Sequence, residues 1–264
     1  ALKAHRLAGR VVGCDREDVL EQALSAGAIG QAQPDMAAAC AGSDLVVLAL
    51  PVGGIIDAIA RIAKVISKKT LVTDVGSTKR EICAAAERAW GGEAAQRFLP
   101  GHPMAGKAEG GIGHASAELF QGAPWLFTPW SSGTPSGAAT DFMDSVRTFG
   151  ARPVLCTAEE HDRVCAYVSH LPQMLSTALA NVVDENGEEG IDGKHLAGAG
   201  LRSMTRLAAS PYAMWRDIAL TNSDNLAAAL LQMEQKLAHI RENLKSPELR
   251  AEFERAQAAR AVLK

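Results

Sequence analysis

The chain has 264 residues, of which 47% are hydrophobic and 22% charged, and its formal net charge is −3. This length suits one large domain or two of ordinary size, and the apolar content supports a real core, which excludes a disordered chain. The near-neutral charge, with no basic stripe, argues against nucleic acid or an anionic membrane surface as the main partner.

Targeting signals and cysteine usage both favour the cytoplasm. No apolar run reaches the length of a bilayer span and no signal peptide opens the chain, so we expect a cytoplasmic protein that binds no membrane. The five cysteines have no CxxC spacing. We interpret them as buried free thiols in a reducing compartment and expect no metal site. They are Cys14, Cys40, Cys83, Cys156 and Cys165.

Short apolar runs alternate with helical segments in the first half of the chain. Runs such as DLVVLALP are apolar throughout, which is typical of strands covered on both faces. Strands are predicted at 10–15, 44–51, 70–77, 97–103, 123–129 and 151–156. Helices are predicted after the first three of them, at 16–27, 53–66 and 78–90. This alternation predicts an α/β Rossmann-type domain over residues 1–156, with a doubly wound parallel sheet.

After residue 156 the sequence reads as helical. A long helix from Glu159 to about Val183 contains Pro172, which predicts a kink, and another helix runs through 196–209. Ser210 followed by proline opens a long helix to about Lys245. A last helix follows Ser246 and its proline. We therefore predict an all-α domain over residues 157–264.

The helix predicted to end near Lys245 carries a narrow apolar seam. Its members step by four and three alternately: Leu226, Leu230, Met233, Leu237, Ile240 and Leu244. Such a seam packs on another helix. We predict a homodimer through the helical domain, because so small a domain covers its long helices poorly alone. A seam within one chain is the alternative.

Asp15 ends the first predicted strand. In a dinucleotide-binding fold an acidic residue at such a strand end accepts hydrogen bonds from the adenosine ribose hydroxyls. An acid there also repels a 2′-phosphate, so NAD is favoured over NADP, although Arg16 keeps NADP open. Aspartate after a strand is also a common turn residue. Leu50 and Pro51 follow another strand, at the place where the backbone of this fold passes the cofactor's riboses.

The glycine-rich turn that normally precedes such an acidic residue is absent. The chain begins ALKAHRLAG, which resembles the back of a first helix, so a strand and a phosphate-binding turn of roughly fifteen residues are lacking. We expect either a truncated sequence or a sheet built differently. A chain that begins here is expected to bind a cofactor poorly or not at all, since the pyrophosphate has no helix N-terminus to occupy.

Two residues stand out as candidates for chemistry. His102 lies between Pro-Gly and Pro, before a glycine-rich loop, and a neutral imidazole near its normal pKa suits a general base. The alternative is a loop histidine with a structural hydrogen bond. Ser77 follows a strand, and ligands lie beyond the carboxyl ends of strands in open parallel sheets. The alternative for Ser77 is an N-cap of the next helix.

Several motifs in order resemble one family. They are TDVGSTK at 73–79, GHPMAG at 101–106, LFQGAPWLFTP at 119–129, HD and SHLP within 161–172, and MTRLAASPYAMWRDI at 204–218. Together they closely resemble the prephenate and arogenate dehydrogenases of tyrosine biosynthesis. The resemblance implies a Rossmann domain and a helical dimerisation domain. It also implies an oxidative decarboxylation, in which the ring carbon bearing the hydroxyl gives hydride to a nicotinamide cofactor while CO2 leaves.

The resemblance implies roles for three residues. His102 matches the family's catalytic histidine, which accepts the proton of the substrate's C4 hydroxyl. Ser77 is placed at that hydroxyl and the nicotinamide, hydrogen-bonding both His102 and the substrate. Arg206 binds a substrate carboxylate through its guanidinium fork, with a surface or dimer salt bridge as the alternative. The small-molecule substrate is then expected in the cleft between the two domains.

Two positions depart from the pattern of many prephenate-specific members. Gln173 stands where those enzymes have a histidine that helps to hold the substrate's side-chain end. A neutral amide can donate and accept, so it fits either the ketoacid of prephenate or the amino acid of arogenate. Glu109 lies one place later than a glutamate of those enzymes. Prephenate remains the first prediction, and arogenate is the alternative.

Other residues near the motifs are interpreted more simply. His170 either faces the cleft, as a substrate-binding residue, or is a core histidine. Asp74 is placed at the cofactor edge, where it positions the loop rather than reacts. Lys79 is either functional or a solvated helix residue, and Trp215 is interpreted as a packing residue.

Two rival functions follow from the same layout. One is a β-hydroxyacid or 6-phosphogluconate-type dehydrogenase, which uses a lysine of the helical half as base, whereas this chain has SHLPQ there and no lysine nearby. The other is a non-catalytic, degenerate Rossmann dimer, which the absent glycine turn favours.

Overall fold

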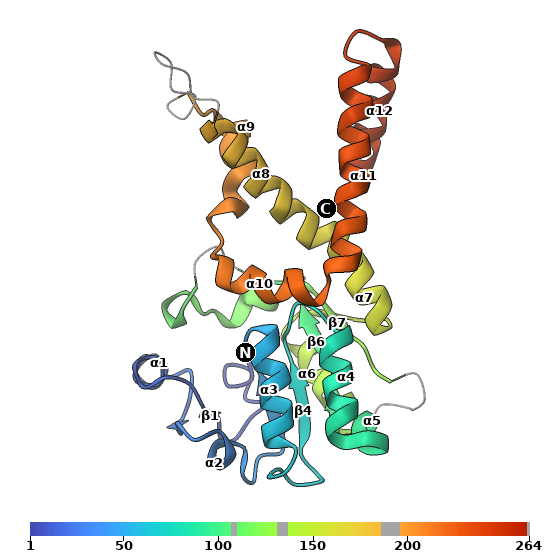
Figure 1. Ribbon diagram of the computed structural model, residues 1–264. Coiled ribbons are helices and arrows are strands. Elements are labelled where there is room, and N and C mark those ends of the chain that lie inside the picture. Colours follow the sequence, from blue (N-terminus) through green and yellow to red (C-terminus); the bar gives the residue numbers. More distant parts are fainter. Residues whose placement is uncertain (107–109, 131–136, 186–195, 263–264) are drawn as a thin grey trace.

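The computed structural model describes residues 1–106, 110–130, 137–185 and 196–262 (Figure 1). An α/β part, drawn in blue to green, is followed by helices that rise from it as two separate arms. One arm holds α8 (Leu171–Glu185) and α9 (Ala199–Thr205), and the other holds α11 (Ser223–Glu242) and α12 (Pro247–Val262). The chain therefore has the two-part organisation that its sequence predicts.

The strands of the α/β part are short and mostly parallel. They are β1 (Val12–Gly13), β2 (Gln31–Ala32), β3 (Leu45–Leu48), β4 (Leu71–Asp74), β5 (Phe98–Leu99), β6 (Gly101–Pro103), β7 (Pro124–Phe127) and β8 (Arg152–Leu155). β1 pairs with β2, β3 with β4 and β4 with β5, and β7 with β8, all in parallel. Parallel strands need crossover connections, and the helices between them provide these.

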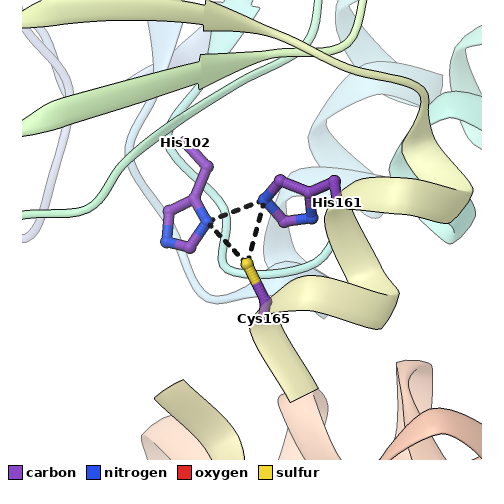
Figure 2. Close-up of side chains that lie close together, drawn as sticks. All are labelled: His102, His161 and Cys165. Carbon is purple, nitrogen blue, oxygen red and sulfur yellow. Dashed lines mark hydrogen bonds between the residues drawn. The ribbon is translucent and has the colours of Figure 1, made fainter. Parts of the chain in front are cut away.

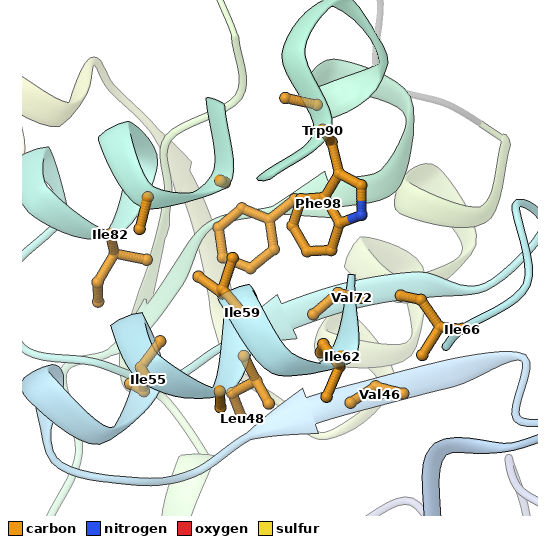
Figure 3. Close-up of a cluster of buried hydrophobic side chains, with 14 of the residues drawn as sticks. Val46, Leu48, Ile55, Ile59, Ile62, Ile66, Val72, Ile82, Trp90 and Phe98 are labelled. Atoms are coloured by element: carbon orange, nitrogen blue, oxygen red, sulfur yellow. The ribbon is translucent and has the colours of Figure 1, made fainter. Parts of the chain in front are cut away.

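Apolar clusters lie on both faces of the strands. One contains Val72 and Phe98 with α3 (Val52–Ile62) and α4 (Arg80–Trp90), as Figure 3 shows. The other contains the neighbouring strand residues Leu71 and Leu99 with α6 (Gly137–Thr148). Successive residues of a strand point to opposite faces, so each strand contributes to both clusters. Helices on both faces confirm the predicted Rossmann-type α/β fold.

The strand β6 differs from the expectation of a wholly parallel sheet. It pairs antiparallel with β7, with His102 opposite Leu126. A parallel pair would need a long crossover, usually helical. Among its described residues the connection from β6 to β7 has only two short 3-10 turns, η2 (Ile112–His114) and η3 (Ala117–Phe120), and the chain reverses there.

The N-terminal region also differs in detail from the prediction. Residues 2–6 form turns rather than the back of a helix, with the N–H of Leu7 bonded to the carbonyl of Leu2 at 2.9 Å. Helix α1 (Glu17–Ser25) matches a predicted one, whereas β2 and α2 (Met36–Cys40) were not predicted. Both are very short, so their apolar pattern is too brief to show a period.

The predicted kink near Pro172 is present as a change of helix type. Helix α7 (Ala158–Cys165) continues into a π-helical segment, η4 (Ala166–His170), and then into α8. Proline has no N–H to give the carbonyl four residues back, which is that of Val168, and its ring crowds that carbonyl. The ladder widens where this conflict arises, as in other π-bulges.

The single helix predicted from 210 to about 245 was wrong. The structure has α10 (Tyr212–Thr221) and α11, separated at Asn222, whose φ is −133°. The Asn222 side chain donates to the carbonyl of Asp162 at 2.7 Å and lies 3.2 Å from Nδ1 of His170. These buried hydrogen bonds to another helix hold the break. The remaining short helices are α5 (Ala94–Arg97), η1 (Gly91–Glu93) and η5 (Arg206–Ala209).

The apolar seam of α11 is covered only at its beginning. Leu226 is buried, and Leu230 and Met233 pack against a cluster that includes Leu171. Further along, Leu237 is 53% exposed, and Leu244, which belongs to the predicted seam but lies beyond the end of α11, is 61% exposed. Packing within one chain, the alternative to a dimer contact, therefore covers only the first turns of the seam. Within the described ranges no helix is both long and apolar enough to cross a bilayer.

Candidate active site

Two adjoining cavities share the side chain of His102. The first, of about 460 Å³, is lined by Ser77, by Trp125, and by residues after β3 such as Ala49. The second, of about 370 Å³, is lined by Arg206 of the helical part and by Ser169 of the π segment. His102 therefore stands at the boundary between the α/β part and the helical part, where the sequence analysis expects a cleft.

The backbone next to His102 is fixed by a close approach between strands. The N–H of Gly101 donates to Oδ1 of Asp74 at 3.0 Å. A Cβ at position 101 would lie 2.9 Å from the carbonyl oxygen of Asp74 and 3.0 Å from Nε1 of Trp125. Only glycine fits between these groups, so the GHP motif brings β6 against the end of β4 and sets the place of His102.

His102 begins a chain of three buried side chains, and Figure 2 shows the first two of them together with Cys165. Its Nδ1 lies 2.8 Å from Nε2 of His161, and Nδ1 of His161 lies 2.8 Å from Oδ1 of Asp162. The sulfur of Cys165, one turn after His161 on α7, lies 3.6 Å from that same Nε2. His161, Asp162 and Cys165 have at most 1% of their surface exposed. The histidine on β6 is thus held by two residues of the helical part.

The charge states of this chain follow from burial and hydrogen bonding. Burial holds the pKa of His102 well below its ordinary range, with the neighbouring His161 acting in the same direction, so the expectation of a pKa near the normal value was wrong. Burial also lowers the pKa of His161, although the hydrogen bond to Asp162 opposes it. For Asp162 burial raises the pKa, but hydrogen bonds from His161 and from two backbone N–H groups outweigh it, so the net shift is downward. Both rings are therefore neutral near pH 7, and the carboxylate is charged.

The tautomers follow from these charge states. An ionised Asp162 only accepts, so Nδ1 of His161 carries its proton and Nε2 of His161 has a lone pair. That lone pair accepts from Nδ1–H of His102. The remaining nitrogen of His102, Nε2, is then an unprotonated acceptor with no hydrogen bond to the described residues. The arrangement presents a base at the boundary of the two cavities.

Asp162 also joins the two parts of the chain. Its carboxylate accepts from the backbone N–H of Lys79 at 2.7 Å and of Arg80 at 3.0 Å, which are orphan donors at the start of α4. The guanidinium of Arg80 pairs with both Asp162 and Asp224. A cap from another domain replaces the local N-cap expected of Ser77, and α4 begins at Arg80 without a side-chain cap of its own.

Asp74 and Lys79 form an ion pair with no exposed atoms. Oδ2 of Asp74 accepts from Lys79 Nζ and from the N–H of Gly76 at 2.8 Å. Lys79 is thus buried, and the expectation of a solvated helix residue was wrong. The carboxylate of Asp74 is fully enclosed, so a direct contact with a cofactor does not fit this arrangement. It positions the loop between β4 and α4 instead.

Ser77 and Arg206 line different cavities, each shared with His102. Ser77 lines the first cavity with His102, but the structure has no hydrogen bond between the two side chains. Arg206 lines the second cavity from η5, and among the described residues its guanidinium has no carboxylate partner. The salt-bridge alternative therefore has no support within this chain.

The side chains of Gln173 and His170 make their contacts within the helical part. The amide of Gln173 donates to the carbonyl of Leu207 at 2.9 Å and so holds the turn that carries Arg206. His170 is fully buried, lies against Trp215 with ring centroids 5.9 Å apart, and has its pKa lowered to about 4 by burial. His170 and Trp215 are core residues here, and none of these three lines either cavity beside His102.

The residues predicted to contact a cofactor lie at the ends of β1 and β3. Asp15 is exposed, and its Oδ1 accepts from the backbone N–H of Arg16 at 2.7 Å, as in a turn. Its Oδ2 has no partner among the described residues, which leaves an acceptor suited to a ribose hydroxyl. Leu50 is 40% exposed and Pro51 is the N-cap of α3. Glu109 lies outside the described residues.

The sequence analysis missed the roles of His161, Asp162 and Cys165, although it quoted the HD motif. A local signal was present: Thr157 and Glu160 form a capping box, with both reciprocal hydrogen bonds made. This signature fixes the start of α7. A defined start puts His161 and Cys165 four residues apart on one helix face, but the chain alone does not show that His102 packs against that face.

Two family models together match nearly the whole chain. The family model described as prephenate dehydrogenase, nucleotide-binding domain matches residues 1–155, and that described as prephenate dehydrogenase, dimerization domain matches residues 157–256. The prephenate dehydrogenase of Lactococcus lactis is 31% identical over 81% of this chain, and the cyclohexadienyl dehydrogenase of Zymomonas mobilis is 32% identical over 84%.

The solved structures agree with these matches. A crystal structure of prephenate dehydrogenase from A. aeolicus in complex with hydroxyphenyl propionate and NAD+ has a TM-score of 0.89 at 25% identity, covering 100% of this chain and 92% of that one. The chain spans 58% of the Lactococcus lactis protein, 61% of the Bacillus subtilis prephenate dehydrogenase and 76% of the Zymomonas mobilis protein. On both family models and these relatives, the chain belongs to the prephenate dehydrogenase family.

Proposed function

We propose that this protein oxidises and decarboxylates prephenate to 4-hydroxyphenylpyruvate in tyrosine biosynthesis, with NAD as hydride acceptor and His102 as base. The observation that carries the proposal is the place of His102, which lines two cavities and whose Nδ1 lies 2.8 Å from Nε2 of His161. One cavity is lined by Ser77 and the other by Arg206. Family membership supplies the reaction class, and this geometry supplies a base and a carboxylate partner for it.

The reaction needs protein groups at two points of the substrate: a cation for a carboxylate and a base for the C4 hydroxyl. Arg206 has no carboxylate partner among the residues that the structure describes, so its fork is available for a carboxylate of the substrate. Nε2 of His102 takes the proton of the C4 hydroxyl as the bond to oxygen becomes a carbonyl, and the ring aromatises when CO2 leaves. The bound nicotinamide ring supplies the acceptor for the hydride that leaves C4.

The hydrogen-bonded chain behind His102 stabilises the product of this proton transfer. When Nε2 gains a proton the ring becomes a cation, and its Nδ1–H donates more strongly to His161. His161 in turn donates to the charged Asp162. The negative charge of Asp162 therefore opposes, for the protonated ring, the effect of burial that lowers the pKa of His102, and the neutral resting ring keeps Nε2 ready to accept.

The exposed residues that follow β1 suit NAD better than NADP. Asp15 offers a free carboxylate oxygen after β1, and a carboxylate there accepts from ribose hydroxyls and repels a 2′-phosphate. Arg16, its neighbour, pairs with Asp18 at 3.5 Å and is the residue through which NADP could still be used. Leu50 and Pro51 lie between the end of β3 and the start of α3.

Arogenate is the second candidate substrate. Gln173 replaces a histidine of many prephenate-specific members, and its amide is directed at the backbone of Leu207 rather than at a cavity. The chain therefore lacks a charged group at this position to select a ketoacid over an amino acid. The relative named cyclohexadienyl dehydrogenase fits this reading, since both substrates are cyclohexadienes.

We further propose that the protein is a cytoplasmic homodimer joined through its helical part. Leu237 and Leu244 continue the seam of α11 beyond the residues that pack within the chain. Phe253 on α12 is 63% exposed as well. A second copy would cover this apolar surface, and the domain in question matches a dimerization model. All five cysteines are free, which fits the reducing cytoplasm.

Initial rates test the proposal. NADH or NADPH formation is measured on the full chain with prephenate and with arogenate, each with NAD+ and with NADP+. The highest kcat/KM is expected for prephenate with NAD+. A higher value with arogenate would transfer the assignment to the second candidate, and no reduced cofactor with any of the four pairs would refute the proposed function.

A further inference from the structure

The proposed base and two side chains beside it form a compact set of metal ligands. Nδ1 of His102, Nε2 of His161 and Sγ of Cys165 lie within 4.8 Å of one another, and all three residues are buried (Figure 2). The edges of this triangle measure 2.8 Å between the nitrogens, and 4.0 Å and 3.6 Å from the sulfur to His102 and His161. The proposed reaction does not use Cys165.

These distances approach one face of a tetrahedral zinc site. Two Zn–N bonds span about 3.3 Å between the nitrogens, and a Zn–N and a Zn–S bond span about 3.6 Å. Both sulfur edges lie within about half an ångström of that value. The two nitrogens lie closer together than zinc requires because they share a proton. An ion that replaces this proton would move them apart by about half an ångström.

The surroundings of the triangle also suit a cation. Nδ1 of His161 bonds to Oδ1 of Asp162, so the histidine that would bind metal through Nε2 already has a carboxylate behind it. Such carboxylate–histidine–zinc arrangements orient the ring and strengthen the ligand. The nearby Lys79 is neutralised by its ion pair with Asp74. His102 lines both cavities, which gives an ion a route from solvent.

We propose that His102, His161 and Cys165 bind a zinc ion, and that this ion switches off the proposed base. Two nitrogens and one sulfur would occupy three positions of a tetrahedron, and a water molecule the fourth. On binding, the S–H bond of Cys165 and the shared N–H bond of His102 are replaced by bonds to the metal. The thiol proton is released to solvent, while the His102 proton moves to its Nε2.

The consequence for His102 lies in its tautomer. A neutral imidazole has one N–H and one lone pair, so a metal on Nδ1 leaves the proton on Nε2. The nitrogen at the cavity boundary then donates and can no longer accept. This consequence rests on the proposed function, whereas the metal site itself rests on the triangle alone.

Metal binding is tested first without any turnover. The metal-free full chain is titrated with Co2+, a spectroscopic substitute for zinc, and with Zn2+ by calorimetry. We expect one ion per chain, visible bands of tetrahedral cobalt and a thiolate-to-cobalt charge-transfer band. Cys165→Ala should weaken Zn2+ affinity by about 100-fold or more, since even partners behind the ligands contribute about 10- to 100-fold. Cys156→Ala, a cysteine outside the triangle, should bind as the wild type does.

Each result decides the metal site. No binding at one ion per chain, cobalt spectra without the thiolate band, or equal affinity in Cys165→Ala and wild type would overturn it. The cobalt spectrum of the wild type gives an answer even if Cys165→Ala does not fold, which circular dichroism would show.

Turnover is then measured with and without Zn2+. A chelator is added afterwards to test whether the effect of zinc is reversible. We expect a fall in kcat of about two to four orders of magnitude, the usual contribution of a base, recovered with EDTA and absent in Cys165→Ala. Stoichiometric zinc with unchanged kcat would overturn the switch. A protein that binds zinc through Cys165 but oxidises neither substrate in the metal-free form would refute the proposed function and leave the site standing.

Discussion

Nδ1 of His102 lies 2.8 Å from Nε2 of His161, although one residue belongs to strand β6 and the other to helix α7, 59 positions later. The contact joins the α/β part to the helical part at the point where the two cavities meet. A base on a sheet edge is thus oriented by a partner from the other domain. The tautomer of His102, and with it the proposed chemistry, depends on how the two parts pack.

The first prediction concerns His161 as a positioning residue. Replacing His161 by leucine removes the acceptor for Nδ1–H of His102, so the ring is free to take the other tautomer. We expect kcat to fall by up to about 10⁴-fold, as when a catalytic histidine loses its orienting partner, with KM for prephenate little changed. His161→Gln keeps one acceptor and one donor, so it should retain distinctly more activity. Equal losses in both variants would mean that His161 only fills space.

The second prediction concerns the base itself. His102→Asn removes the titratable ring but keeps a small polar side chain on β6. Turnover should fall by about two to four orders of magnitude, the usual contribution of a positioned base. NAD+ affinity, measured by calorimetry, should stay the same, because His102 is proposed to contact the C4 hydroxyl of the substrate and is not among the residues predicted to contact the cofactor. Turnover like that of the wild type would remove His102 from the reaction.

The third prediction concerns Arg206. Arg206 lines the second cavity, and no carboxylate in the described ranges pairs with it, so Arg206→Ala should mainly raise KM for prephenate. Arg202→Ala is the matched control, because the Arg202 side chain bonds to the carbonyl of Ala197 and lines neither cavity. If the two variants give the same KM, Arg206 does not bind substrate.

The α/β half could be predicted well because its signals are local. Apolar runs such as the one containing β3 are ended by proline or glycine, and each is followed by an amphipathic helix. The antiparallel β6 could not be predicted in this way, since strand direction depends on how the loop before β7 turns. The break at Asn222 was missed for a similar reason: it is held by hydrogen bonds to residues far away in sequence.

The candidate site was predicted only in part. His102, Ser77 and Arg206 carry motif signals and do line adjoining cavities. The burial of Asp74 and Lys79 could not be inferred, because charged residues after a strand are exposed in most proteins. The partners of His102 were missed because a hydrogen bond between two domains leaves no spacing in the sequence.

The fourth prediction concerns the buried ion pair of Asp74 and Lys79. Lys79→Met leaves a carboxylate in the core without its counterion, so the free energy of unfolding should fall by about 3–5 kcal/mol. The double variant Asp74→Asn with Lys79→Met removes both charges and should be less destabilised than Lys79→Met alone. Lys68→Met, which breaks an exposed pair with Glu93, should change the stability by less than about 1 kcal/mol. Urea denaturation measures all three variants, and a double variant destabilised as much as Lys79→Met or more would argue against direct pairing.

The last prediction concerns pH and His170. Burial lowers its pKa from the ordinary 6.5 to about 4, so the folded protein keeps this ring neutral while the unfolded chain takes up a proton below pH 6.5. The unfolded state then binds more protons between those values, and stability falls as the pH falls through that window. At about 1.4 kcal/mol per pH unit, His170 should account for a loss of about 2 kcal/mol between pH 7 and pH 5.

His170→Gln keeps an acceptor for the amide of Asn222 but cannot titrate. Its free energy of unfolding, from urea denaturation at both pH values, should therefore fall by about 2 kcal/mol less than that of the wild type. His102 and His161, whose pKa values burial also lowers, are present in both proteins, so their contributions cancel in the comparison. Equal losses in the two proteins would show that His170 is not held neutral by its burial.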